Sequence, residues 1–313
     1  MRIGAVVPMY PPESRVGSWL STHEFLKVLN AAGHDVVANP VMSGGPEYLL
    51  DGVRVVPGLE RMEETVAGAD VVISHLGDSG HAHRLAVYHN IPSVRMVHGL
   101  IGHDALRQMS DSPPDLLVFN SESSALIARH RCPHIVVHPI FDRQAFETTP
   151  GDRVTFVNLS DSKGVAMFQK LVRFMPDVQF LGVKGGYGAQ RSVVGRNVEV
   201  VACTQNMRDD VYARTRVLLM PSKAETWGMV GVEAMCSGIP VMASPTPGLK
   251  ESLGDAGVFV EQNNFKGWIE GLRHLLKGDV WSAACVKASV RVAQLDSYEG
   301  AVLFVKSVEG LKR

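Results

Sequence analysis

The chain has 313 residues, of which 45% are hydrophobic and 20% are charged. This composition excludes a disordered or fibrous protein, and the length allows two α/β halves, each with its own core. No apolar run approaches the roughly 18 residues that cross a bilayer. The first ten residues lack the layout of a signal peptide, so we expect a cytosolic protein. The four cysteines lie far apart without a CxxC pair, which predicts neither a zinc site nor a disulfide framework.

The net charge of −1 is unevenly distributed along the chain. Residues 1–150 hold 11 basic and 16 acidic side chains, a balance of −5, and residues 151–313 hold 20 and 16, a balance of +4. We therefore expect the second half to bind any anionic ligand. The acidic first half gives no strong signal for nucleic acid or an anionic membrane, because both attract clustered Lys and Arg.

The first half alternates strands and helices. Met1–Val7 predicts a strand that ends at Pro8, and Ser18–Ala32 has helical periodicity. Further strands are predicted at 53–56, 71–74, 93–97, 116–120 and 135–137, and further helices at 59–67 and 80–88. This alternation is typical of a doubly wound parallel sheet, in which ligands bind at the carboxyl ends of the strands. His98 lies at such an end.

The second half begins with the same pattern. Arg153–Leu159 predicts a strand, the next loop carries Lys163 and Gly164, and Val165–Phe174 predicts a helix. This repeat of the opening indicates two Rossmann-like halves facing a cleft. A lysine in that loop can neutralise a diphosphate as a point charge.

The most informative stretch of the chain runs from Arg216 to Glu251. A short apolar strand ends at Pro221, because proline cannot donate to a strand ladder. Met229–Cys236 predicts a helix that stops at Gly238, and Ile239–Ala243 predicts a buried strand. The stretch is therefore a βαβ unit.

Two carboxylates, Glu225 and Glu233, stand eight residues apart at the start of this helix. Between them the backbone N–H groups of a helix N-terminus favour an anion such as phosphate. The residues that carry these groups are Trp227, Gly228, Met229 and Val230. Carboxylates accept hydrogen bonds from hydroxyl groups, so the pattern implies a sugar phosphate or a nucleotide sugar. On spacing alone, a surface Glu225 and a solvated Glu233 are equally compatible with the sequence.

The segment PSKAETWGMVGVEAMCSGIPV resembles the Glu-x7-Glu signature of glycosyltransferase family 4, which usually reads P-S-x-x-E-x-F-G-x-x-x-x-E-A-M-A-x-G-x-P-V. The resemblance implies the GT-B fold and retaining transfer from a nucleoside diphosphate sugar without a metal ion or other cofactor. It implies that Glu225 positions the sugar and that Glu233 binds the ribose of the donor. The nucleobase of relatives is held largely by main chain, so the side chains do not specify it.

Lys163-Gly164 resembles the family pattern G-R-x-x-x-x-K-G, but Asn158 stands at the position of the arginine. One of the two expected cations is therefore missing from the donor site. Lys184, in the glycine-rich loop after the next strand, is our candidate to replace it. A solvated loop lysine is the alternative at that position.

Two residues of the first half are candidates through the same resemblance. His98-Gly99 resembles the family's V-H-G segment, whose histidine contacts the donor sugar, so His98 joins Glu225 as a predicted catalytic residue. The first loop of relatives carries a glycine pair at the donor phosphate, and here only Gly17 is present. An ordinary turn glycine is the alternative for Gly17.

The sequence thus predicts an acceptor domain at 1–148, a donor domain at 152–295 and a last helix at 296–313 that crosses back to the first domain. The predicted function is a retaining, metal-independent glycosyltransferase that uses a nucleotide-sugar donor and an acceptor hydroxyl bound by the first domain. Two alternatives remain open. One is a nucleotide-sugar epimerase or hydrolase on the same scaffold, and the other is a sugar-nucleotide binding protein that has lost catalysis.

Overall fold

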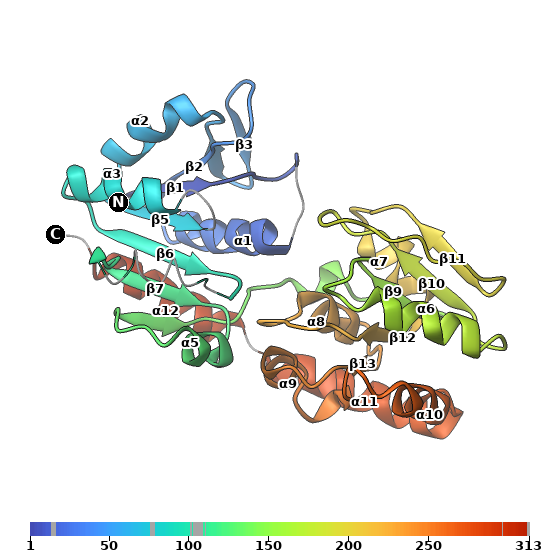
Figure 1. Cartoon of the computed structure of the whole chain (residues 1–313). Coiled ribbons are helices and arrows are strands. Elements are labelled where there is room, and N and C mark those ends of the chain that lie inside the picture. The colour runs from blue at the N-terminus through green and yellow to red at the C-terminus, as the bar shows by residue number, and fades with distance from the viewer. Residues whose placement is uncertain are drawn as a thin grey trace. The chain divides into compact units, whose positions relative to one another are not determined.

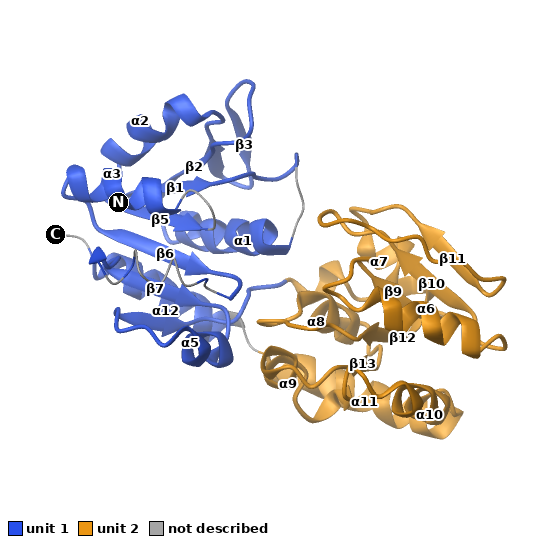
Figure 2. Cartoon of the chain, in the orientation of Figure 1, with its two compact units in different colours: residues 1–141, 297–313 blue, residues 142–296 orange. Residues whose placement is uncertain are grey.

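The computed structural model describes residues 1–13, 17–75, 79–100, 102, 109, 111–295 and 297–311. The chain folds into two compact units (Figure 2). The first unit comprises Met1–Phe141 and Ser297–Arg313, and the second comprises Asp142–Asp296. Each unit contains its own sheet and its own hydrophobic core.

The described sheet of the first unit has eight strands in the order β3-β4-β2-β1-β5-β6-β7-β8 (Figure 1). Neighbouring strands are parallel, except that β3 pairs antiparallel with β4 at the edge. The strands are β1 (Arg2–Val7), β2 (Asp35–Pro40), β3 (Tyr48–Leu50), β4 (Val53–Val55), β5 (Val71–His75), β6 (Ser93–Val97), β7 (Leu116–Phe119) and β8 (His134–Val136). The predicted doubly wound sheet is confirmed.

Helices cover both faces of this sheet. They are α1 (Gly17–Ala31), the 3-10 helix η1 (Leu59–Arg61), α2 (Met62–Ala67), α3 (Ser79–Tyr88), α5 (Glu122–Ala128) and α12 (Ser297–Glu309). Successive side chains of a strand point to opposite faces. In β1, Ile3 and Val7 therefore pack with α1 and α12, whereas Val6 packs with α2 and α3 on the other face.

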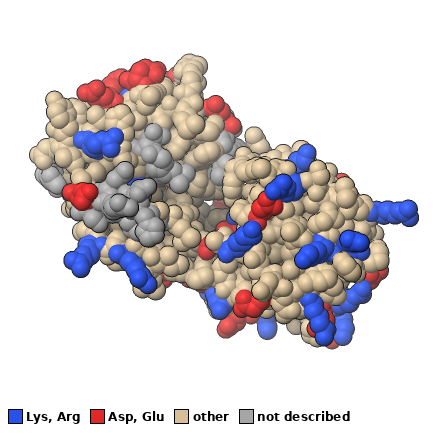
Figure 3. All heavy atoms as spheres, in the orientation of Figure 1, with Lys and Arg blue, Asp and Glu red and all other residues tan. Residues whose placement is uncertain are grey.

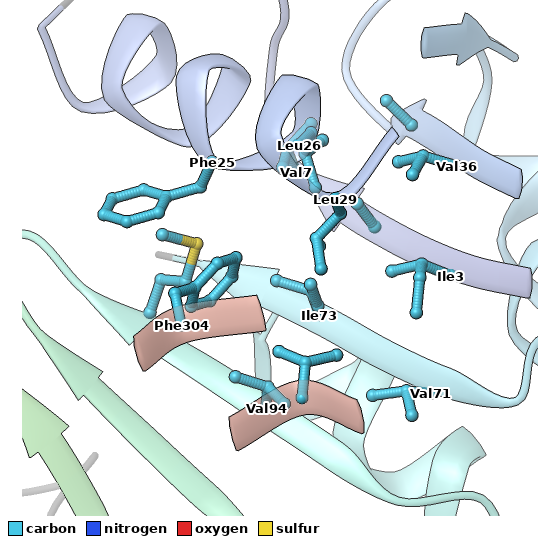
Figure 4. Close-up of a cluster of buried hydrophobic side chains, with 14 of the residues drawn as sticks. Ile3, Val7, Phe25, Leu26, Leu29, Val36, Val71, Ile73, Val94 and Phe304 are labelled. Carbon is cyan, nitrogen blue, oxygen red and sulfur yellow. The ribbon is translucent and has the colours of Figure 1, made fainter. Parts of the chain in front are cut away.

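The last helix, α12, is part of the core of the first unit. The rings of Phe304 and Phe25 lie 4.8 Å apart between their centroids, and both side chains are buried (Figure 4). Phe304 also belongs to the same cluster as Ile73 and Val94 from the sheet. The chain thus returns to the first unit after it has formed the second. Residues 296, 312 and 313 of the predicted last segment lie outside the described residues.

The described sheet of the second unit has six parallel strands in the order β11-β10-β9-β12-β13-β14. The strands are β9 (Arg153–Val157), β10 (Phe180–Val183), β11 (Val198–Val201), β12 (Thr215–Met220), β13 (Val241–Ala243) and β14 (Val258–Phe259). The reversal of strand order beside β9 is the topology of a Rossmann-like sheet. The two-sheet α/β fold predicted from the sequence is therefore confirmed.

The helices of the second unit follow its strands closely in sequence. The α-helices are α6 (Val165–Phe174), α7 (Met207–Asp210), α8 (Met229–Cys236), α9 (Pro247–Leu253), α10 (Phe265–Leu275) and α11 (Gly278–Gln294), and the 3-10 helices are η3 (Arg143–Ala145), η4 (Tyr212–Arg214) and η5 (Gly254–Ala256). Helices α6 and α10 pack on one face of the sheet, where Phe156, Phe168 and Trp268 share a core. Helix α8 packs against β12, β13 and α11. Among the described helices, none has both the length and the hydropathy that crossing a bilayer requires.

The second unit begins earlier in the chain than the sequence analysis places it. The Ser237 hydroxyl at the end of α8 donates to the carbonyl of Phe146 at 2.7 Å and accepts from the backbone N–H of Thr148 at 2.9 Å. These bonds hold residues 142–148 to the second unit, whereas the predicted first domain extends to residue 148.

We predict that Phe304→Ala lowers the free energy of unfolding of the first unit by about 3–5 kcal/mol, because it leaves a cavity against Phe25. Urea denaturation of the whole chain measures this change. The matched control is Leu303→Ala on the same helix, where the side chain is 44% exposed and the expected loss is below about 1 kcal/mol. Equal losses in the two variants would show that α12 does not contribute to the core.

Candidate functional site

An ion pair joins two loops at the carboxyl ends of neighbouring strands in the second unit. Lys163 lies in the loop after β9, and Glu225 lies in the loop after β12. The Lys163 ammonium donates to Oε1 of Glu225, and the Ser222 hydroxyl donates to the same oxygen at 3.1 Å. The two charged side chains are only 22% and 11% exposed. The structure thus brings together two residues that stand 62 positions apart in the sequence.

The pair keeps Lys163 charged. Burial alone would lower the pKa of Lys163, but the carboxylate of Glu225 and the hydroxyl of Tyr187 outweigh it, and the pKa is raised. A positive charge is therefore held at the strand ends. On the face of the molecule drawn in Figure 3, further Lys and Arg side chains are spread over the second unit. Both observations agree with the basic balance of this half of the sequence.

Gly164 allows the two loops to approach. It precedes α6 with φ of 90°, and a Cβ atom built on it would lie 2.1 Å from the carbonyl oxygen of Pro221. The backbone N–H of Lys223 donates to the carbonyl of Ser162 at 3.0 Å across the same junction. A side chain at position 164 would separate the loops and move Lys163 away from Glu225.

Helix α8 begins without a side-chain cap from the described residues. Its first turn follows Gly228, which has φ of 84° and whose Cβ would lie 2.5 Å from the side chain of Leu249. No side chain in the described part of the chain caps this helix, and Gly228, Met229 and Val230 are half-buried. Uncapped N–H groups and the helix dipole together favour an anion here. The predicted main-chain donors are therefore present, whereas the Trp227 side chain is buried in the core.

Glu233 lies in the second turn of α8 and is held by Tyr212. The Tyr212 hydroxyl donates to Oε2 of Glu233 at 2.5 Å, and Tyr212 itself is fully buried. Burial raises the pKa of Glu233, and the bond from Tyr212 opposes that rise. Oε1 of Glu233 accepts no hydrogen bond from the described residues. Tyr212 thus fixes one of the two carboxylate oxygens.

Asn158 and Lys184 occupy different environments. Asn158 is buried just after β9 with φ of 68°, and its Oδ1 accepts from Nε2 of Gln190 at 2.9 Å. The Lys184 side chain is exposed, and it forms no hydrogen bond or ion pair with any residue that the structure describes. No contact therefore supports the predicted replacement of the family arginine by Lys184.

The two candidates of the first unit belong to one helix and the strand end next to it. Gly17 is the exposed first residue of α1. In the same helix, the Thr22 hydroxyl donates to the carbonyl of Ser18 at 2.9 Å and lies 3.1 Å from Nε2 of His98. Since the single hydroxyl hydrogen of Thr22 is used by Ser18, Nε2 of His98 must carry the proton in this contact. The ring of His75 packs edge-on against His98, with 5.0 Å between the ring centroids.

His98 is uncharged at neutral pH. Removal of the ring from water lowers the pKa of His98 to about 4. The side chain can therefore form hydrogen bonds with a ligand, but it is not a proton donor of the imidazolium type. Among the described residues, no group of three or more His, Cys, Asp or Glu side chains is arranged to hold a metal ion.

The sequence analysis missed three polar residues of the second unit. Tyr212 positions Glu233, Ser222 supports Glu225, and Gln190 contacts Asn158. Tyr212 and Gln190 lie 21 and 32 positions from their partners, so no periodic signal identifies these two contacts. Only Ser222, three residues before Glu225, is close enough for a local pattern to suggest the contact.

Comparison with known proteins places the residues around this ion pair in a family. Residues 163–278 match the family model described as glycosyl transferases group 1. This segment, 116 of the 313 residues, is similar to that family. It contains Lys163, Glu225, α8 and Glu233, and it confirms the resemblance to glycosyltransferase family 4.

Two curated relatives are D-inositol 3-phosphate glycosyltransferases. The protein of Corynebacterium aurimucosum is 30% identical over 100 residues, which cover 31% of this chain and 24% of the relative. The protein of Mycolicibacterium vanbaalenii is 27% identical over 272 residues, which cover 67% of this chain and 60% of the relative. The chain therefore spans between about a quarter and three fifths of the length of these two glycosyltransferases.

Solved structures confirm the predicted GT-B fold. Sucrose-phosphate synthase from Thermosynechococcus elongatus matches with a TM-score of 0.79 and 16% identity, covering 98% of each chain. Anabaena HepE, solved in complex with UDP-glucose, matches with a TM-score of 0.81 and 16% identity, covering 99% of this chain and 100% of that chain. At such identities the likeness concerns the fold.

We predict that Tyr212→Phe raises the pKa of the Glu233 carboxyl, because the variant removes the bond that favours the ionised form but retains the burial that disfavours it. Protonated Glu233 then persists to higher pH. Carbon-13 NMR of glutamate-labelled protein follows this titration, with Glu233→Gln to assign the signal and Tyr187→Phe as a control. An unchanged Glu233 titration in Tyr212→Phe would contradict the described contact.

Proposed function

We propose that this protein transfers a sugar from a nucleoside diphosphate sugar to an acceptor hydroxyl. The observation that carries the proposal is the placement of Lys163 and the uncapped start of α8 within the segment that matches the family model. A lysine ammonium and helix N–H groups are the donors that a diphosphate requires. The paired acids of the same segment suit the hydroxyl groups of a sugar and a ribose.

Stabilisation of the leaving diphosphate is the main catalytic contribution in this proposal. Negative charge grows on the bridging oxygen as the bond to the sugar breaks, and preorganised donors at that position lower the barrier. Lys163 supplies a full charge, and the N–H groups at Met229 and Val230 supply partial charges. The ammonium is paired with Glu225 in the free protein, so donor binding must replace part of that interaction.

The two acids take different parts in this mechanism. Glu225, held by Lys163 and Ser222, accepts hydrogen bonds from the sugar, and Glu233 offers its Oε1 to the ribose. Tyr212 keeps the Glu233 carboxylate from rotating. His98, whose pKa is lowered to about 4, takes no part in proton transfer in this proposal.

The relatives suggest the first substrates to test. Anabaena HepE was solved with UDP-glucose, so UDP-sugars are the first donors. The curated relatives are D-inositol 3-phosphate glycosyltransferases, so D-inositol 3-phosphate is the first acceptor, and we propose that the first unit binds it. Gly17, the exposed start of α1, is proposed to lie beside the donor phosphate.

We further propose that the anomeric configuration is retained and that no metal ion is needed. Lys163 and the α8 amides supply the positive charge that a divalent cation would otherwise supply at a diphosphate. Attack by the acceptor on the face of the sugar that the diphosphate leaves would give retention without a protein nucleophile.

We predict that Lys163→Ala, Glu225→Ala and Glu233→Ala each lower kcat/KM by at least about 100-fold, because each removes a charged contact to the donor. Release of nucleoside diphosphate measures turnover, and calorimetry measures donor binding. Lys223→Ala is the matched control, since its side chain is exposed in the same loop, and it should stay within about twofold of the wild type. Full turnover in both glutamate variants would remove them from the site.

We also predict that turnover persists in excess chelator and that the product keeps the anomeric configuration of the donor. Proton NMR of the product reports both the configuration and the rate. Free or epimerised sugar formed without acceptor would instead indicate a hydrolase or epimerase. Tight donor binding without turnover across an acceptor panel would indicate a binding protein.

A further inference from the structure

The side chain of Gln190 links two loops of the second unit through hydrogen bonds. Its Oε1 accepts from the backbone N–H of Leu159 at 2.9 Å and from that of Gly185 at 2.8 Å. Only the carbonyl end of an amide can accept, so these two bonds determine the orientation of the group. Nε2 of Gln190 therefore points toward Asn158, and it donates to Oδ1 of Asn158 at 2.9 Å and to the carbonyl of Tyr187 at 2.8 Å.

This arrangement determines the orientation of Asn158 as well. Because Oδ1 is the acceptor, the remaining end of the Asn158 amide is the Nδ2 donor group. Asn158 is 5% exposed, and Nδ2 has no hydrogen-bond partner among the described residues. A buried donor without a partner is unfavourable, and such groups in native proteins require an explanation, such as a role in catalysis or a water or ion at the site.

The loop after β10 covers this donor closely. A Cβ atom built on Gly185 would lie 2.6 Å from Nδ2 of Asn158, so only glycine allows the loop to rest there. Gly186 and Gly188 follow in the same loop, and Gly188 has φ of 74°. Three glycines give this segment the conformational freedom to lift away from Asn158.

We propose that Asn158 and Gln190 form a neutral amide clasp for one phosphate oxygen of the donor. Asn158 Nδ2 is the donor to that oxygen, and Gln190 is the positioning residue that turns Nδ2 toward it. Movement of residues 185–188 away from Asn158 admits the phosphate. It breaks the bonds of Gln190 with Gly185 and Tyr187, whereas the bonds with Leu159 and Asn158 keep Nδ2 oriented. This inference rests on the proposed function, and it replaces the predicted role of Lys184 as a second cation.

A neutral amide at position 158 changes how the negative charge of the diphosphate is balanced. A guanidinium at position 158 would bind phosphate in part by long-range attraction, which salt screens. An amide binds through a short-range hydrogen bond alone. The diphosphate is then held by a single ammonium, that of Lys163, together with uncharged N–H groups.

The experiment compares UDP with uridine by calorimetry on the whole chain. Asn158→Ala and Gln190→Ala should each weaken UDP binding roughly tenfold, since each removes a hydrogen bond to a charged group or its support. Both variants should leave the uridine affinity unchanged. The salt dependence of UDP binding should stay as in the wild type for Asn158→Ala and should fall for Lys163→Ala.

Two further variants distinguish phosphate binding by Asn158 from a change in the conformation of the loops. Asn158→Asp keeps the acceptor for Gln190 but replaces the free donor by an oxygen, so UDP binding should fall at least as far as in Asn158→Ala. Gln169→Ala is the matched control, because the Gln169 side chain also accepts from a backbone N–H and donates to a backbone carbonyl, both of Val194, elsewhere in the unit. It should bind UDP as the wild type does.

The possible results distinguish failure of the amide clasp from failure of the proposed function. UDP binding by Asn158→Asp at the wild-type affinity would overturn the clasp while leaving the proposed function intact. Equal losses of UDP and uridine affinity in Gln190→Ala would also overturn it, since they would indicate a general loosening. If the wild type binds neither UDP nor GDP nor ADP, the proposed function itself fails, and the clasp fails with it.

Discussion

The attraction between the Lys163 ammonium and the Glu225 carboxylate is the interaction on which the candidate site depends. It joins the loops after β9 and β12, two neighbouring strands, and it is largely shielded from water. Removal of either partner would leave an uncompensated charge in a half-buried position, which is strongly unfavourable. Both loops are therefore held in place by the same contact that supplies the charges for ligand binding. The charged groups of the site are therefore held together before a ligand arrives, and a ligand must replace part of their mutual attraction.

The parts of the site that were predictable are those that depend on local sequence. Glu225, Gly228 and Glu233 belong to one strand–loop–helix segment, and their spacing already places both acids at the start of α8. Tyr212 and Gln190 were not predictable, because each reaches its partner across separate loops that only the packed sheet brings together. The sequence shows that a cation of the family pattern is missing at Asn158. Only the structure shows that the neutral side chain of Gln190 contacts that position.

The fold was predictable where strands are apolar and helices begin and end with clear signals. Helix α11 lacked such a signal, since only Ala284, Ala288 and Val292 along its length are buried and its other faces mix valine with polar residues. The three-residue edge strand β3 was also too short to show an alternating pattern. The start of the second unit at Asp142 depends on Ser237, which lies about ninety positions further along the chain. No local feature of residues 142–148 indicates that attachment.

The docking of α12 gives the first unit a discontinuous sequence. During synthesis the ribosome releases residues 1–141 first, then all of the second unit, and only afterwards the helix that carries Phe304. Domains generally fold as they emerge. Here the first unit remains incomplete while the second unit folds, and the apolar surface around Phe25 stays uncovered until α12 has been synthesised. The second unit therefore completes its folding before the first. Chaperone dependence should therefore reside in residues 1–141, which are translated before the second unit.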